Sequence, residues 1–132
     1  DVPRRREGVL VTQTATAGRT TTPWRNWART EQVTPARVER PTSADEVVDA
    51  IARARADGLP VKAIGSGHSF TGIAVAPGVQ LDLTDLAGLS RVDPGTGLVT
   101  LAAGTTLHDA SALLHEHGLA FENLGDIDAQ SI

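Results

Sequence analysis

The stretch Val61-Lys62-Ala63-Ile64-Gly65-Ser66-Gly67-His68-Ser69-Phe70-Thr71-Gly72 decides how the rest of the chain is interpreted. Its first four residues are mostly apolar, which is typical of a buried strand that Gly65 then interrupts. The glycines permit tight backbone turns, and successive N–H groups in such a turn can bind an anion, with the serine hydroxyls as further donors. The stretch therefore predicts a strand that opens into a diphosphate-binding loop with His68 at its centre.

Two common nucleotide-binding motifs do not fit this loop. The Rossmann pattern G-x-G-x-x-G needs a third glycine where Phe70 stands, although Asp85 lies where the ribose-binding acid of that motif is expected. That pattern also needs a helix directly after the loop, and the next predicted element is a strand. The Gly-Lys-Ser/Thr sequence of a Walker loop is absent. On these residues alone, a purely structural glycine turn stays open.

Length and composition indicate one globular domain. The 132 residues are enough for a hydrophobic core, and the absence of cysteine excludes disulfides and thiolate metal sites. No apolar run reaches the roughly 20 residues of a membrane-spanning helix, and no signal-peptide pattern opens the chain. We expect a soluble cytoplasmic protein, with association to a membrane surface as the alternative.

The charge is unevenly distributed along the chain. Residues 1–40 carry eight arginines against four acidic residues, a net charge of +4, whereas residues 41–132 carry a net charge of −8. Residues 1–22 contain few large apolar groups and are expected to form a mobile basic leader. The body is acidic and the leader has no interleaved aromatic residues, so we do not expect nucleic-acid binding.

The clearest predicted helix follows Pro41. Ser43 and Glu46 fit a capping box, and Asp57-Gly58 followed by Pro60 is a stop signal that leads directly into the strand 61–64. A stripe at helical spacing is expected to face the core, and it consists of Val47, Val48, Ile51, Ala54 and Arg55.

The remaining elements predict a mixed α+β fold rather than a regular βαβ alternation. A short β-branched run at 33–40 contains Pro35, which favours an edge strand or an extended entry into the sheet. Residues 79–84 alternate as a half-buried strand with Gln80 facing outward, and a turn at 93–97 predicts a hairpin with 98–102. A second helix starts after Thr106 and ends at Gly118, and a short strand is expected at 119–121.

Several polar and aromatic residues are candidates for function. His68 has the chemistry of a neutral nucleophile or base. The spacing of His108, His115 and His117 does not place them around one metal ion, so we expect no metal site. Asp126 and its neighbours form either a carboxylate site or a solvated loop. Two tryptophans, Trp24 and Trp27, are expected to pack onto the core rather than to stack on a ligand.

Three separated motifs together resemble a known family. They are Trp24–Trp27, the run from Pro41–Val47 to Val61–Phe70, and Asn123–Ile132. In this order they are similar to the start of the PCMH-type FAD-binding domain of the vanillyl-alcohol-oxidase superfamily. Within it they most resemble the sugar-1,4-lactone oxidases, which include L-gulonolactone and D-arabinonolactone oxidases, and alditol oxidase. The resemblance covers residues 24–132.

This resemblance implies an α+β domain of two small subdomains that binds FAD. Residues 23–132 would be its N-terminal part, with the rest of the domain and a substrate domain following in a longer polypeptide. The resemblance places the FAD diphosphate at the loop Ala63–Ser69 and implies that His68 bonds covalently to the 8α-methyl carbon of the flavin. The implied cofactor-binding residues are Ala63, Ile64, Gly65, Ser66, Gly67, His68, Ser69, Asp126 and Ser131.

The implied activity is an FAD-dependent oxidoreductase that oxidises a carbinol of a sugar lactone or alditol. Hydride would pass to flavin N5, and dioxygen or another acceptor would then reoxidise the flavin. No catalytic residue is expected in this segment, because the family carries its acid/base residues in the substrate domain. The expected partners are a small polyol or sugar-lactone substrate and the remaining polypeptide. Two alternatives are a non-catalytic nucleotide-binding module and an interaction protein that acts through its basic leader.

Overall fold

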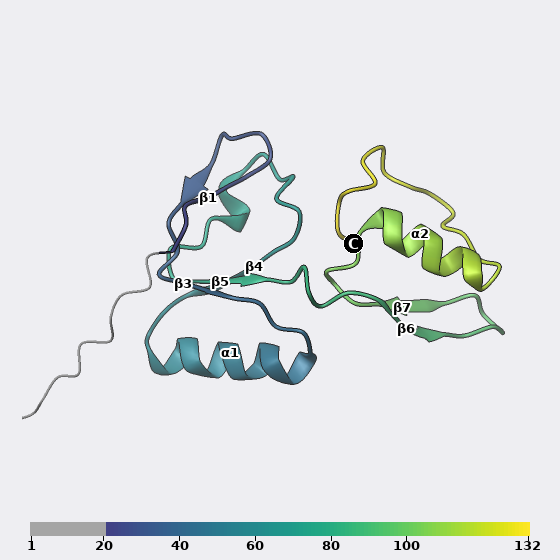
Figure 1. The fold of residues 1–132 in the computed structure, drawn as a ribbon, viewed down its shortest axis with the longest axis horizontal. Coiled ribbons are helices and arrows are strands. Elements are labelled where there is room, and N and C mark those ends of the chain that lie inside the picture. Colours follow the sequence, from purple (N-terminus) through teal and green to yellow (C-terminus); the bar gives the residue numbers. More distant parts are fainter. Residues whose placement is uncertain (1–20) are drawn as a thin grey trace, which may run out of the picture.

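A three-stranded parallel sheet with one helix against it forms the first half of the molecule (Figure 1). The computed structural model describes residues 21–132, so most of the predicted leader lies outside the described residues. The strand order is β3 (Arg37–Glu39), β5 (Val79–Asp82), β4 (Val61–Ile64), with Val38, Gln80 and Lys62 in register. Helix α1 (Ala44–Ala56) connects β3 to β4, which leaves the central position of the sheet to β5.

Small side chains bring α1 close to the sheet. Ala50 and Ala54 are buried against Val79 and Leu81 of β5, and Val47 packs at the edge of this cluster. The prediction that Val48 and Ile51 belong to the buried stripe is wrong, since their side chains are 64% and 45% exposed. A sheet of only three short strands covers a narrow strip of the helix, and the alanines, which permit the closest approach, occupy that strip.

The central strand is buried on both faces. Figure 1 shows α1 below the sheet and the β1 hairpin with the 3₁₀ helix η1 (Gly72–Ala74) above it. Gln80 is therefore only 2% exposed, and the prediction that it faces solvent is wrong. A strand covered on both faces does not need the alternation that a half-exposed strand shows.

The segment before the sheet forms a separate small hairpin. Strands β1 (Trp24–Arg25) and β2 (Gln32–Val33) pair antiparallel, and buried Pro35 separates β2 from β3. The predicted single run at 33–40 is thus divided in two. The expected edge position is confirmed, because β3 has only one neighbouring strand.

The second half of the molecule is a hairpin that packs with a helix. Strands β6 (Leu89–Val92) and β7 (Val99–Leu101) pair antiparallel across the predicted turn, where Gly97 has a φ of 73°. Helix α2 (Leu107–Glu116) begins after Thr106, whose side chain accepts a hydrogen bond from the backbone N–H of Asp109. The strand predicted at 119–121 is not formed, because no described strand lies beside it to supply ladder hydrogen bonds.

Close backbone contact joins the two halves. Gly104 donates its N–H to the carbonyl of Leu86 at 2.8 Å, and a Cβ at this position would overlap the carbonyl of Leu83. Buried Thr105 bonds through Oγ1 to Ala102 and Gly88.

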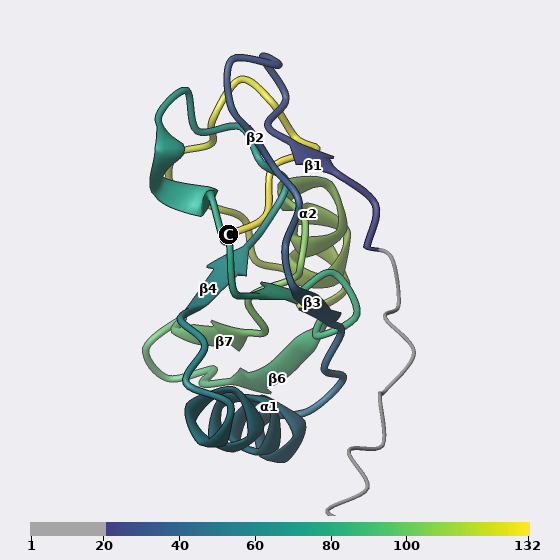
Figure 2. The same ribbon diagram turned by 90° about the vertical axis from the view of Figure 1, so that its left-hand side faces the viewer.

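Figure 2 shows that the β1–β2 hairpin and α1 lie at opposite ends of the molecule. No helix in residues 21–132 is long and apolar enough to cross a membrane.

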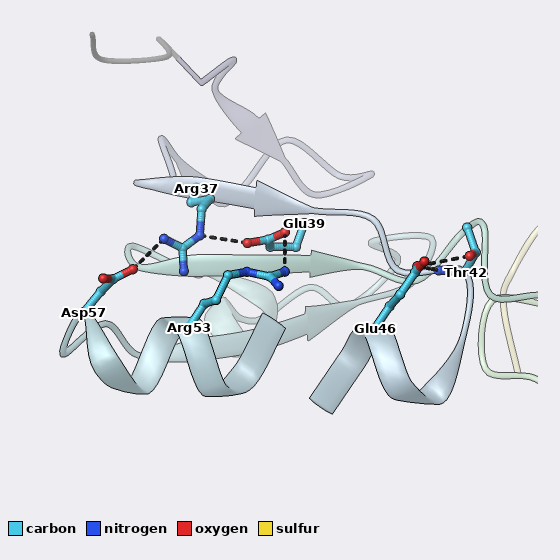
Figure 3. A network of polar contacts seen from close by, with 6 residues as sticks. All are labelled: Arg37, Glu39, Thr42, Glu46, Arg53 and Asp57. Carbon is cyan, nitrogen blue, oxygen red and sulfur yellow. Dashed lines mark hydrogen bonds and ion pairs between the residues drawn. The ribbon is translucent and has the colours of Figure 1, made fainter. Parts of the chain in front are cut away.

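Ion pairs connect β3 to the C-terminal half of α1 (Figure 3). Arg37 bonds to Asp57 at 2.7 Å and lies 2.9 Å from Glu39, which also pairs with Arg53 at 3.2 Å. The hydrogen bond to Asp57 raises the pKa of Arg37 more than the nearby charges do. Partly exposed pairs such as these contribute little individually to the stability of the fold.

The start of α1 is capped as predicted, with one difference. The Ser43 hydroxyl accepts from the N–H of Glu46 at 3.2 Å. The Glu46 carboxylate, however, accepts from the N–H of Thr42 at 2.7 Å and from its hydroxyl at 3.0 Å (Figure 3), one residue before the cap. The backbone bond from Thr42, followed by the hydroxyl bond, holds the pKa of Glu46 below its usual value.

We predict that Glu46→Gln makes the stability of the protein less sensitive to acid. Because the pKa of Glu46 is lower in the folded state, its bonds contribute stability above the unfolded-state pKa, and this contribution is lost as pH falls through the folded-state value. The measurement is the thermal midpoint at about pH 7 and about pH 3. The variant should lose fewer degrees than the parent. Glu122→Gln, in an exposed loop, is the control, and an equal loss in all three proteins would contradict the prediction.

Candidate cofactor-binding cleft

A cleft of about 300 Å³ opens where β4 ends. The whole predicted loop Ala63–Ser69 lines it, and so does Ser131 from the far end of the chain. The lining is completed by Ile73, Ala74 and Gln130, which were not among the predicted site residues. The cleft thus brings together two of the three motifs on which the resemblance rests.

Reciprocal hydrogen bonds hold the two sides of the cleft together. The N–H of Ser66 donates to Ser131 Oγ at 3.3 Å, and the N–H of Ser131 donates to Ser66 Oγ at 2.8 Å. The Ser66 hydroxyl also donates to the carbonyl of Ala129 at 2.9 Å. Gly65 permits this approach, because a Cβ there would overlap Ser131 Oγ. The glycine is therefore required for contact between segments as well as for a turn.

Three backbone N–H groups of the loop are available as donors to a ligand. The N–H groups of Gly67, His68 and Ser69 donate to no acceptor within residues 21–132. Gly67 has a φ of 70°, which L side chains rarely adopt, and this turns the chain so that consecutive N–H groups can converge. Such an arrangement binds anions, and a phosphate group is the natural ligand among cofactors.

His68 lies in the cleft beneath an aromatic ring. Its Nδ1 is buried and has no hydrogen-bond partner within the described residues. The indole of Trp27 stacks on the imidazole with ring centroids 5.6 Å apart and an interplanar angle of 25°. The prediction that Trp27 packs onto the core is wrong, since its side chain is 61% exposed. The other tryptophan, Trp24, lies beside the loop, where a Cβ added at Gly67 would be 3.2 Å from its indole ring.

Asn26 is a site-forming residue that sequence reasoning missed. Its side chain is 2% exposed and donates through Nδ2 to the carbonyl of Ser69 at 3.0 Å and to Thr30 Oγ1 at 2.9 Å. Its Oδ1 accepts from the N–H of Glu31 at 3.0 Å. The neighbouring N–H, of Trp27, donates to the carbonyl of Gly67 at 2.8 Å. The only signal in the sequence was its position between the two tryptophans.

The other candidate residues lie away from the cleft lining. Asp126 is exposed in the loop before Ala129 and does not line the cleft. His108 Nδ1 lies 3.3 Å from a carboxylate oxygen of Asp128 at the surface. Within residues 21–132, no three histidine, aspartate or glutamate side chains come together as a group that could hold a metal ion.

We predict that Gly65→Ala destabilises the protein and that Ser131→Ala partly rescues it. The added Cβ has no space beside Ser131 Oγ, and such overpacking costs about 1–3 kcal/mol. Ser131→Ala alone should also destabilise, because the N–H of Ser66 loses its acceptor. A double-mutant cycle in urea measures the coupling. Additive costs for the two substitutions would contradict the close contact between these segments.

We predict that Asn26→Ala costs about 1–3 kcal/mol of unfolding free energy, because buried partners lose their hydrogen bonds. Asn123→Ala is the matched control, since Asn123 is exposed in a loop and should change the free energy by less than about 0.5 kcal/mol. Urea denaturation measures both variants. Equal stability of the Asn26 variant and the control would show that Asn26 does not hold the loop.

Comparison with known proteins identifies similar chains. The chain is 45% identical over 109 residues to an L-gulono-1,4-lactone dehydrogenase of Mycobacterium tuberculosis. The matched region covers 83% of this chain and 26% of the relative. The chain is 38% identical over 104 residues to the L-gulonolactone oxidase of Bos taurus, with 79% and 24% covered. The chain thus spans about a quarter of the length of these relatives.

The fold also resembles a solved structure, that of a solvent-stable cholesterol oxidase. The TM-score is 0.71 at 26% sequence identity, over 85% of this chain and 22% of the other. The comparison confirms the predicted fold class, a mixed α+β FAD-binding fold. The family model described as FAD binding domain matches residues 35–132, which contain the loop Ala63–Ser69 and Ser131. The chain therefore belongs to the FAD binding domain family.

Proposed function

We propose that the chain forms the first part of the cofactor site in an FAD-dependent oxidoreductase that oxidises a carbinol of a sugar lactone or an alditol. Membership of the FAD binding domain family supports the cofactor. The names of the relatives, a lactone dehydrogenase and a lactone oxidase, support the substrate class. Since the chain spans about a quarter of these relatives, the activity is proposed for the whole protein.

One observation carries this proposal. The loop 65–69 and the segment 129–131 meet at a single cleft although sixty or more positions separate them in the sequence. There the loop presents backbone N–H groups without acceptors, and an anion such as the diphosphate of FAD would satisfy them. Gly67, His68 and Ser69 are the residues we expect to hold it through these groups.

The buried Nδ1 of His68 also fits a flavin. A buried polar atom without a partner is costly, so a ligand atom is expected to occupy its vicinity in the loaded protein. We propose that His68 is the residue that attaches the flavin covalently. Attachment would join an imidazole nitrogen of His68 to the 8α carbon in place of one methyl hydrogen, with the methyl proton and the imidazole proton released to solvent. The electron pair of the broken C–H bond would stay with the ring until dioxygen or another acceptor removed it.

The residues of this chain would bind and orient the cofactor. When bound, FAD supplies an acceptor at N5 for the hydride of the substrate carbinol. The backbone of the loop compensates the diphosphate charge, and attachment at His68 fixes the position of the ring and alters its reduction potential. Residues 21–132 place no second ionisable group in the cleft lining besides His68. The base for the carbinol proton is therefore expected elsewhere in the protein.

We predict that His68→Ala abolishes covalent attachment but not FAD binding. The full-length protein is loaded with FAD and precipitated with acid, and the flavin in the pellet is measured by absorbance. The parent pellet should keep its flavin, and the His68→Ala pellet should be colourless although the native variant is yellow. His108→Ala, at an exposed histidine outside the cleft, is the control and should behave like the parent.

The outcomes separate the parts of the proposal. A colourless parent pellet from a yellow native protein would contradict covalent attachment alone, whereas a parent protein that binds no FAD would contradict the function. The substrate class is tested by anaerobic bleaching of the flavin. Sugar lactones and alditols should bleach it, and a sterol should not. Bleaching by the sterol alone would overturn the proposed substrate class.

A further inference from the structure

The β1–β2 hairpin lies against the cofactor loop, although the family model match begins only after it, at residue 35. Its attachment is specific: buried Asn26 binds the carbonyl of Ser69, and the N–H of Trp27 binds the carbonyl of Gly67. These two bonds hold the main chain on both sides of His68. The hairpin therefore contacts the loop at the residue for which a covalent role is proposed.

Trp27 itself is not explained by burial. Its side chain is 61% exposed, so it contributes much less hydrophobic stabilisation than a buried tryptophan would. What the indole does contact is aromatic: it stacks on His68 and meets the ring of Phe70 edge-on, with centroids 6.2 Å apart and an interplanar angle of 84°. Phe70 is itself 67% exposed. The three rings form a small aromatic group beside the cleft.

We propose that Trp27 is a positioning residue that fixes the imidazole of His68 in the orientation needed for flavin attachment. This inference rests on the proposed role of His68. An imidazole on a glycine-rich loop can rotate about two side-chain torsions, and a stacked indole favours one ring plane. The backbone bonds of Asn26 and Trp27 hold that indole relative to the loop. The hairpin thereby raises the fraction of molecules in which the imidazole nitrogen faces the reacting carbon.

The first test follows the rate of attachment in full-length apoprotein after FAD is added, measured as flavin retained in acid pellets over time. Trp27→Leu should slow attachment about tenfold or more, because orientation is lost. Trp27→Phe keeps a stacking ring and should recover most of the rate. Leu98→Ala, which removes a comparably exposed apolar side chain at a distance from the cleft, should attach flavin at the parental rate.

Two further measurements would change if Trp27 only supported the fold. Non-covalent FAD affinity, measured in the His68→Ala background, and the thermal midpoint should both stay close to the corresponding parent values in Trp27→Leu. A large fall in either, in step with the slower attachment, would overturn the positioning role in favour of simple structural support. An unchanged attachment rate in Trp27→Leu would overturn it as well.

A second test does not depend on covalent attachment. In protein labelled with ¹³C at histidine, a stacked indole displaces the resonances of the His68 ring protons through its ring current. The His68→Ala variant assigns them. Trp27→Leu should move these resonances toward free-histidine values, and Leu98→Ala should not. If the parent shows no covalent flavin but the resonances move as expected, the covalent role of His68 is contradicted, whereas the stacking of Trp27 on His68 is confirmed. If the resonances stay in place, the positioning proposal is overturned.

Discussion

The structure of the cleft depends on the contact between Ser66 and Ser131. Each serine donates its backbone N–H to the hydroxyl of the other, and Ser66 also donates to Ala129, so three hydrogen bonds connect two distant segments. The contact is short enough that Gly65 has no space for a side chain. It also joins the two halves of the molecule, because the next residue after Ser131 donates to the carbonyl of Thr105 in the second half. The same interaction thus closes the cleft and connects the halves.

This constraint determines which backbone N–H groups of the loop are left for a ligand. Ser66 uses its own N–H in the contact with Ser131, and the following N–H groups, from Gly67 to Ser69, remain without acceptors in the described part of the chain. On the opposite side, the carbonyls of Gly67 and Ser69 are taken by the hairpin. With two carbonyls engaged and three N–H groups without acceptors in the described residues, the loop has the backbone donors that anion binding requires.

The sequence was sufficient for the elements whose signals are local. The caps at Ser43 and Thr106, the hairpin turn before Leu98 and the strand 61–64 follow from spacing and turn chemistry, and the structure contains them. The predictions that were wrong concern residues whose environment depends on distant elements, which a local sequence pattern does not reveal. Gln80 is buried because other elements cover both faces of β5, and residues 119–121 lack a partner strand within the described residues. The role of Asn26 and Trp27 likewise depends on a loop some forty residues away.

The dependence on distant contacts has a consequence for stability. Asn26 bonds to Ser69 across 43 residues and Ser66 to Ser131 across 65, so the cleft is complete only when both ends of the described chain have reached the loop. Contacts of this kind close long loops, which costs chain entropy, and among the residues that line the cleft Ile64 alone is buried. The cleft therefore belongs to the less stable part of the molecule. A ligand that binds only the closed arrangement would stabilise it by mass action, so ligand binding at the cleft and order in the loop would be linked equilibria.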